Sequence, residues 1–235
     1  MTTTPIVALD VPSADQALRI VEALGARCRF YKIGNELFTA AGPAVVTRVR
    51  EAGCDVFLDL KLHDIPNTVR GAARSAAALG VRLLTVHAAG GEAMLAAAVE
   101  GGGDRLGILG VTVLTSFDAA SLAQATGRPG IDVSSEVARL AGVAAMVHAH
   151  GIVCAGPEAA AIRDRFGDEL AVLVPGIRMR GEAAHDQRRV VTPAEAAAAG
   201  ARYIVVGRAV TAAPHPSAAM EAVLADLEYG CGSLA

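Results

Sequence analysis

The sequence predicts an α/β fold, a single (β/α)8 TIM barrel that spans residues 1–235 as one domain. Short runs rich in Val, Ile and Leu alternate with longer alanine-rich segments along the whole chain. This alternation favours right-handed strand–helix–strand units and a parallel sheet. The length of 235 residues, of which 53% are hydrophobic, is close to the roughly 250 residues typical of one such barrel.

Eight strands and eight helices are expected from the pattern. The strands are expected, in chain order, at residues 6–9, 30–33, 55–62, 83–86, 106–114, 151–154, 171–174 and 203–206. Each run is too short to be an independent helix and is rich in Val, Ile or Leu. The helices are expected at residues 14–24, 41–52, 66–79, 92–99, 132–147, 157–166, 193–199 and 216–227.

The helix boundaries rest on ordinary start and stop signals. Five helices open at an N-cap residue or a proline: Ser13, Pro66, Pro157, Thr192 and Pro216. Five are closed by a glycine: Gly25, Gly53, Gly80, Gly167 and Gly200. The three glycines at 101–103 are expected to form the loop that leads into the fifth strand.

The sequence also bears on two alternatives, one of fold and one of function. A doubly wound open sheet fits the same alternation, but the first strand is followed by Asp10-Val11-Pro12 instead of a glycine-rich dinucleotide fingerprint. The net charge of −3 argues against a nucleic-acid-binding protein, which usually carries a basic stripe.

The terminal sequence and the cysteines bear on location. We expect a soluble cytoplasmic protein with no membrane association, because no signal peptide and no apolar run of about 20 residues is evident. The spacing of the four cysteines fits neither a disulfide framework nor a zinc site. Cys54 and Cys154 lie in apolar runs and are expected to be buried thiols.

The segment FLDLKLHDIPNT, at residues 57–68, places one lysine between two aspartates at the end of an apolar run. Asp59 and Lys61 are two residues apart, so on a strand they point to the same face. Asp64 falls just beyond the strand. Burying charges without partners is expensive, so this cluster predicts chemistry more strongly than a structural salt bridge.

Polar residues, two glycines and a proline also lie at the ends of the other expected strands, at the barrel end where active sites lie. They are Asp10, Lys32, His87, Thr115, Pro175 with Gly176, and Gly207 with Arg208. Taken singly, each has an ordinary structural explanation, and for His87 a core histidine is slightly favoured. The glycines and Arg208 after the last two strands are typical of a phosphate site, with Gln187 as a further donor. Arg188 and Arg189 are interpreted as surface charge, and the His148 and His150 pair as a solvated helix end.

Taken together, these motifs resemble the orotidine 5′-phosphate decarboxylase family in its bacterial short form. The resemblance is carried by residues 57–68 and by Ala8-Leu9-Asp10, Lys32-Ile33-Gly34, residues 86–91, Leu114-Thr115-Ser116, residues 175–178, Asp186-Gln187 and residues 205–208. It covers essentially the whole chain. The Asp-x-Lys-x-x-Asp core alone is shared with sugar-phosphate relatives.

The resemblance implies decarboxylation of orotidine 5′-monophosphate to UMP, the last step of de novo UMP synthesis, with no cofactor and no metal. It implies a homodimer with shared active sites. Lys61 would be the proton donor to C6, beside Asp59, and Asp64, Ile65 and Thr68 would reach the partner's site. The substrate-binding residues would be Asp10 and Lys32 at the ribose, Thr115 and Ser116 at the pyrimidine, and Pro175, Arg178, Gln187, Gly207 and Arg208 at the phosphate end.

Two alternatives remain open from the sequence. One is a decarboxylase or aldolase acting on sugar phosphates, of the kind that uses magnesium near the same Asp-x-Lys-x-x-Asp core. The other is a phosphate-binding barrel without catalysis. The intact set of Asp59, Lys61 and Asp64 argues against the second, because a pure binder of anions gains nothing from two carboxylates nearby.

Overall fold

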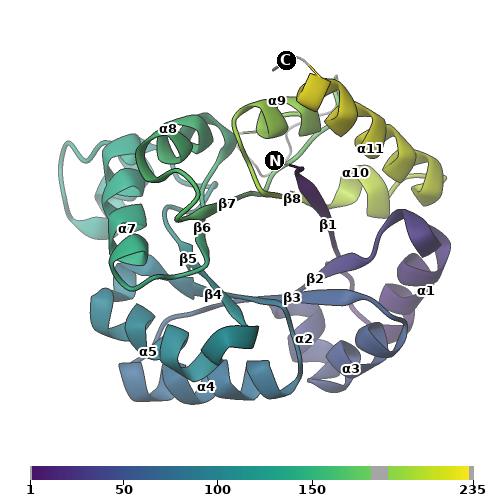
Figure 1. The fold of residues 1–235 in the computed structure, drawn as a ribbon, viewed down its shortest axis with the longest axis horizontal. Coiled ribbons are helices and arrows are strands. Elements are labelled where there is room, and N and C mark those ends of the chain that lie inside the picture. The colour runs from purple at the N-terminus through teal and green to yellow at the C-terminus, as the bar shows by residue number, and fades with distance from the viewer. Residues whose placement is uncertain (1, 181–189, 233–235) are drawn as a thin grey trace.

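The fold is a closed barrel of parallel strands, seen in a computed structural model that describes residues 2–180 and 190–232. The strands pair in chain order, and β1 also pairs with β8, which closes the ring (Figure 1). The strands are β1 Thr4–Ala8, β2 Phe30–Gly34, β3 Asp55–Leu62, β4 Leu83–His87, β5 Gly107–Val111, β6 Gly151–Val153, β7 Ala171–Val174 and β8 Tyr203–Val206. The predicted barrel is therefore confirmed, and the alternative of an open doubly wound sheet is excluded.

The helices form an outer layer around this ring (Figure 1). They are α1 Ala14–Leu24, α2 Asn35–Ala41, α3 Ala44–Glu51, α4 Pro66–Ala78, α5 Glu92–Gly102, α6 Ala119–Thr126, α7 Val133–Met146, α8 Gly156–Phe166, α9 Pro193–Ala198, α10 Arg208–Thr211 and α11 Pro216–Gly232. Short 3₁₀ turns occur at Gly25–Arg27, Ala88–Gly90 and Gly103–Arg105. Among the described residues we find no helix with both the length and the apolar character needed to cross a membrane.

Two apolar layers hold the barrel together. The interior of the ring is filled by side chains from alternate strand positions, among them Phe30, Phe57, Leu109 and Tyr203. A larger cluster lies between the outer face of the strands and the helices. The filled interior makes the barrel a packed core with no open pore, so any ligand must bind at one of its ends.

Three helices were missed in the sequence. Residues 35–41 form α2, which ends at Gly42 with φ +64° before Pro43, so the expected helix 41–52 shortens to α3. The α6 helix was signalled by an overlooked capping box, in which Asp118 and Ser121 cap each other's backbone. The four-residue α10 is too short to show a periodic pattern.

The expected loop at 101–103 was wrong for its first two residues, because α5 continues through Gly101 and Gly102. A Cβ at Gly101 would lie 2.3 Å from the backbone oxygen of Arg70 in α4. Glycine therefore serves here to let α4 and α5 approach closely. The α5 helix ends at Gly102, and its C-cap is Gly103, where φ is +58°.

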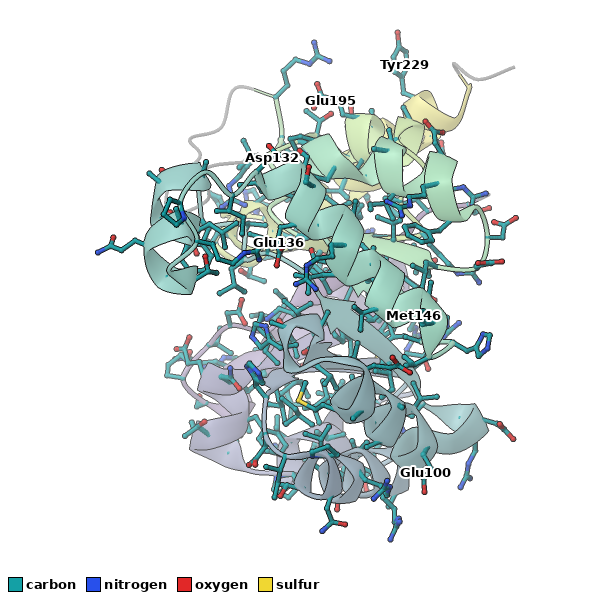
Figure 2. All side chains as sticks on the ribbon, turned by 90° about the vertical axis from the view of Figure 1, so that its left-hand side faces the viewer. Glu100, Asp132, Glu136, Met146, Glu195 and Tyr229 are labelled. Carbon is teal, nitrogen blue, oxygen red and sulfur yellow. The ribbon has the colours of Figure 1, made fainter. Side chains whose placement is uncertain are left out.

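Smaller corrections concern strand and helix ends. β5 is shorter than the expected 106–114, because its ladder with the short β6 ends at the pair Val111 and Val153. His148 and His150 lie beyond α7 and not within it, because the helix ends at Met146, which is labelled in Figure 2, and His148 has φ +54°. Cys54 and Cys154 are buried thiols, as expected.

Candidate active site

A cavity of about 560 Å³ opens at the carboxyl ends of the strands. Ten of the residues expected to form the site line it: Asp10, Lys32, Asp59, Lys61, Thr115, Ser116, Pro175, Arg178, Gly207 and Arg208. They come from six of the eight strand ends or the loops that follow, so the barrel topology brings together residues up to 198 positions apart. Gln187 lies outside the described residues, as do Asp186, Arg188 and Arg189.

The centre of the cavity is a chain of charged side chains around Asp59. The Lys61 ammonium donates to both carboxylate oxygens of Asp59, each at 2.8 Å. On the other side, the Lys32 ammonium lies 3.6 Å from Asp59 Oδ2 and donates to Asp10 Oδ1 at 2.7 Å. Two carboxylates and two ammonium groups therefore alternate across the end of the barrel. Like-charged neighbours are kept apart by opposite charges.

Burial and opposite charge act against each other at Asp59, whose side chain is only 11% exposed. Burial alone would raise the pKa of this carboxyl. The charges of Lys32 and Lys61, with hydrogen bonds from Lys61 and Thr85, outweigh it and hold the pKa of Asp59 below its ordinary value. Asp59 is therefore an ionised carboxylate at neutral pH and keeps a negative charge inside the cavity.

The backbone of Lys61 is unusual for a strand residue, because its φ is +48°. Only glycine adopts this left-handed region freely, and a residue such as lysine is strained there by about 1–2 kcal/mol. Such strain persists where the surrounding contacts over-determine it, and it is concentrated at functional sites. Asp59 and Lys61 do meet, as their spacing predicted, but through a distorted strand end and not a regular one.

The loops after β7 and β8 form the opposite wall of the cavity. Gly176 has φ +76°, which a residue with a side chain would adopt only under strain. Arg178 is buried and donates from Nη1 to the backbone oxygen of Ile177 at 2.8 Å. Arg208, at the start of α10, contributes a second guanidinium to this wall.

Among the described residues that line the cavity, cations outnumber carboxylates, although the whole chain has a net charge of −3. The cations are Lys32, Lys61, Arg178 and Arg208, and the carboxylates are Asp10, Glu36 and Asp59. Glu36 and Thr211 were missed in the sequence. Glu36 lies in the overlooked α2 and Thr211 in the overlooked α10, so recognition of those two helices would have indicated both.

The remaining predicted residues lie away from this cavity. Asp64, Ile65 and Thr68 are all exposed, and Ile65 has 66% of its surface accessible. Asp64 Oδ1 accepts a hydrogen bond from the backbone of Ile65 at 2.7 Å. Thr68 lies in the first turn of α4. The three therefore lie at the surface, outside the cavity of their own barrel.

Two histidines lie between these regions. The rings of His63 and His87 are 5.4 Å apart, and His87 is half-buried at the end of β4. Burial, followed by the nearby charges of His63 and Lys61, lowers the pKa of His87. His87 is therefore not the fully buried core residue that its sequence context slightly favoured.

The fold and site define a (β/α)8-barrel protein with a charged pocket suited to a small anionic molecule. The sequence model of the "Orotidine 5′-phosphate decarboxylase / HUMPS family" matches residues 3–223. The chain belongs to this family.

Curated relatives and solved structures agree with that assignment. The chain is 52% identical over 220 residues to orotidine 5′-phosphate decarboxylase of Anaeromyxobacter dehalogenans, covering 94% of this chain and 96% of the relative. It is 47% identical over 233 residues to that of Cutibacterium acnes, covering 97% and 98%. The crystal structure of orotidine 5′-phosphate decarboxylase from Lactobacillus acidophilus superimposes with a TM-score of 0.84 at 35% identity, covering 96% of this chain and 99% of the other.

Proposed function

We propose that this protein decarboxylates orotidine 5′-monophosphate to UMP and CO₂ in pyrimidine biosynthesis, and that it does so without a metal or organic cofactor. The family match and the curated relatives, at about half identity over nearly their full length, support the activity. The barrel acts as one catalytic domain. The observation that carries the mechanism is the Lys61 ammonium, held 2.8 Å from both oxygens of Asp59 within the cavity.

The reaction breaks the bond between C6 and the carboxylate and leaves an electron pair on C6. No neighbouring carbonyl absorbs that charge, so the protein must stabilise it electrostatically. The Lys61 ammonium supplies a fixed positive charge beside C6 and delivers its proton there, and the neutral amine is reprotonated from solvent. Two unit charges ~4 Å apart interact by about 4 kcal/mol at an effective dielectric near 20, which corresponds to roughly a thousandfold in rate.

Asp59 has two roles in this proposal. It holds the Lys61 ammonium in place in the cavity through two charge-assisted hydrogen bonds. Its own charge lies beside the scissile carboxylate of the substrate, and the two anions repel each other until CO₂ leaves. The low pKa of Asp59 supports both roles, because each requires the ionised carboxylate.

The rest of the cavity binds the parts of the substrate that do not react. Asp10 and Lys32 bind the ribose hydroxyls, Thr115 and Ser116 contact the pyrimidine, and Arg208 binds the phosphate. Further contacts at the phosphate end come from Pro175, Arg178, Gln187 and Gly207. Binding energy from this distant end helps to organise the charged centre, since interactions with non-reacting groups are used in the transition state.

The exposed residues after β3 complete the site of a second copy. In this proposal Asp64, Ile65 and Thr68 reach across a homodimer interface into the partner's cavity. Their exposure supports it, since none of the three lines the cavity of its own barrel. Each active site is then shared between two chains.

A direct assay tests the proposed activity. Purified protein at micromolar concentration is mixed with orotidine 5′-monophosphate, and the ultraviolet absorbance change of the pyrimidine is followed with and without EDTA. We expect rapid conversion to UMP that EDTA does not inhibit. No absorbance change would overturn the proposal, and inhibition by EDTA would favour a metal-dependent reaction of the sugar-phosphate relatives.

A further inference from the structure

Thr85 in β4 is fully buried and does not line the cavity, yet it contacts both members of the charged pair. Its hydroxyl oxygen lies 2.9 Å from the backbone nitrogen of Lys61 and 2.9 Å from Asp59 Oδ1. It therefore joins the backbone of one residue to the side chain of the other. Nothing in the sequence motifs indicated this residue.

The position of Thr85 follows from a break in the ladder between β3 and β4. Leu58 pairs with Leu84, and the next pair is Leu62 with Val86. Three residues of β3, 59 to 61, therefore lie opposite Thr85 alone. The regular backbone hydrogen bonds are interrupted there, as in a bulge, and the Lys61 N–H donates to the Thr85 side chain.

The direction of each hydrogen bond is fixed by chemistry. The backbone N–H of Lys61 can only donate, so the Thr85 oxygen accepts from it. The ionised Asp59 can only accept, so the single hydroxyl proton of Thr85 points to Asp59 Oδ1. The hydroxyl thus accepts one hydrogen bond and donates the other. An apolar side chain makes neither bond, and a side chain that can only donate cannot accept from the Lys61 N–H.

We propose that Thr85 is a positioning residue for the decarboxylation, whose hydroxyl holds the strained Lys61 backbone and the Asp59 carboxylate in the arrangement that directs the Lys61 ammonium into the cavity. This inference rests on the proposed function. Thr85 acts through Lys61 and Asp59 and not on the substrate. It therefore affects the chemical step more than the binding of the phosphate and ribose.

Two substitutions separate the hydroxyl of Thr85 from its shape. Thr85→Val keeps the branched shape and removes the hydroxyl, and Thr85→Ser keeps the hydroxyl and removes a methyl group. Because a hydrogen bond to a charged group corresponds to about tenfold to a hundredfold in rate, we expect Thr85→Val to lower kcat by at least ~10-fold. We expect KM and the Kd for UMP to change by less than ~3-fold, and Thr85→Ser to keep at least about a third of kcat.

The outcomes distinguish this inference from a purely packing role. If Thr85 only packs, Thr85→Val retains activity and Thr85→Ser, which leaves a small void, is the more damaged variant. That result would overturn the inference while the proposed function stands. If the unmodified protein does not decarboxylate orotidine 5′-monophosphate, the proposed function fails and the inference fails with it.

A structural readout covers the case in which Thr85→Val loses activity through misfolding. Melting curves identify that case, and Thr85→Ser then decides the matter, since a loss of kcat above ~10-fold in a folded Thr85→Ser protein contradicts the inference. In a crystal structure of folded Thr85→Val, we expect Lys61 to leave the left-handed region or its ammonium to leave Asp59. An unchanged Lys61 and Asp59 pair would count against the positioning role.

Discussion

Two halves of one sequence motif behave in opposite ways in this fold. Asp59 and Lys61 are drawn into the end of the barrel, where each contacts several charged or polar partners. Asp64 and Ile65, only a few residues later, are exposed, and Asp64 bonds to the backbone of its own neighbour. The first half makes its contacts within one chain. The second half lies at the surface.

The difference is consistent with the proposal that this strand end serves two cavities. The broken ladder at residues 59–61 turns Lys61 inward, and the chain then leaves the sheet through Asp64 to begin α4 at Pro66. Chemistry needs fixed charges, and these are found in the buried half. The exposed half places a carboxylate and an apolar side chain at the surface, where they would reach the partner's site in the proposed homodimer.

The largest expected effect comes from Lys61 in the buried half. Lys61→Ala should lower kcat by about a thousandfold or more, because it removes both the positive charge and the proton at C6. Lys61→Arg should also lose most activity, since a guanidinium keeps the charge but cannot be deprotonated in a protein. Both are measured by the absorbance assay, with UMP binding followed by calorimetry.

The choice of basic residues in the chain sharpens this prediction. Lys32 and Lys61 are the only lysines in the 235-residue sequence, and the other permanently cationic side chains are arginines. Arg82→Ala, at the other end of the barrel, is the matched control, and it should leave kcat within about twofold. Substantial turnover by Lys61→Ala would show that Lys61 is not the proton donor.

Arg208 tests whether the far wall of the cavity assists the buried half. Removing its guanidinium should raise KM strongly and lower kcat/KM by about tenfold to a hundredfold, because it removes charge-assisted hydrogen bonds to the phosphate. Steady-state kinetics of Arg208→Ala measure both. The control is Arg165→Ala on the exposed side of α8, and an unchanged kcat/KM for Arg208→Ala would place the phosphate elsewhere.

Gly34 tests how tightly the alternating charged side chains of the cavity are packed. A Cβ at this position would lie 2.8 Å from the Lys32 ammonium and 3.1 Å from Asp10 Oδ1. Gly34→Ala should therefore displace Lys32 and reduce kcat/KM by roughly tenfold, a loss of about 1.4 kcal/mol. Gly142→Ala in α7, where a Cβ meets nothing within 4 Å, is the matched control. Equal activity of the two variants would show that the Lys32 position is not critical.

The smallest effect is expected on stability, at His87. Its ring contacts that of His63, which lies in the sequence between the two halves of the motif. Its lowered pKa means that the unfolded chain binds a proton more readily than the folded one as pH falls below about 6.5. Stability that is present above pH 6.5 is therefore lost as the pH falls through the folded pKa. The groups that face the ring are His63, Lys61 and Asp59.

In the variant His87→Asn, the decrease in Tm between about pH 7 and pH 5 should be smaller by about one degree. His150, whose pKa is lowered first by burial and then by Arg202 and Arg82, is the matched comparison at the opposite end of the barrel. The same slope of Tm against pH in the unmodified protein, in His87→Asn and in His150→Asn would contradict this account of the two histidines.

Local sequence signals predicted the order of the strands and most of the cavity lining. Residues that follow strands such as β1 and β8 meet at one end because parallel strands share a direction, so Asp10 and Arg208 could be placed together. Closure was predicted from the number of strand–helix units and not from their alternation, which an open sheet also shows. It requires pairing between β1 and β8, which lie at opposite ends of the chain.

The finer features of the site depend on contacts between strands. The left-handed backbone of Lys61 arises from three residues lying opposite Thr85, and a single strand gives no sign of that register shift. Thr85 looked like one more residue of an apolar run. Glu36 was missed for a different reason, since α2 begins without a side-chain cap.

The division of the motif is tested most directly by mixing two inactive proteins. Lys61→Ala and Asp64→Ala chains are denatured together in equal amounts, refolded and assayed for decarboxylation. If each site combines Lys61 of one chain with Asp64 of its partner, half of the dimers are mixed and each has one intact site, so about one quarter of the unmodified activity returns. No recovery, with each protein alone equally inactive and the mixture dimeric, would contradict the shared site.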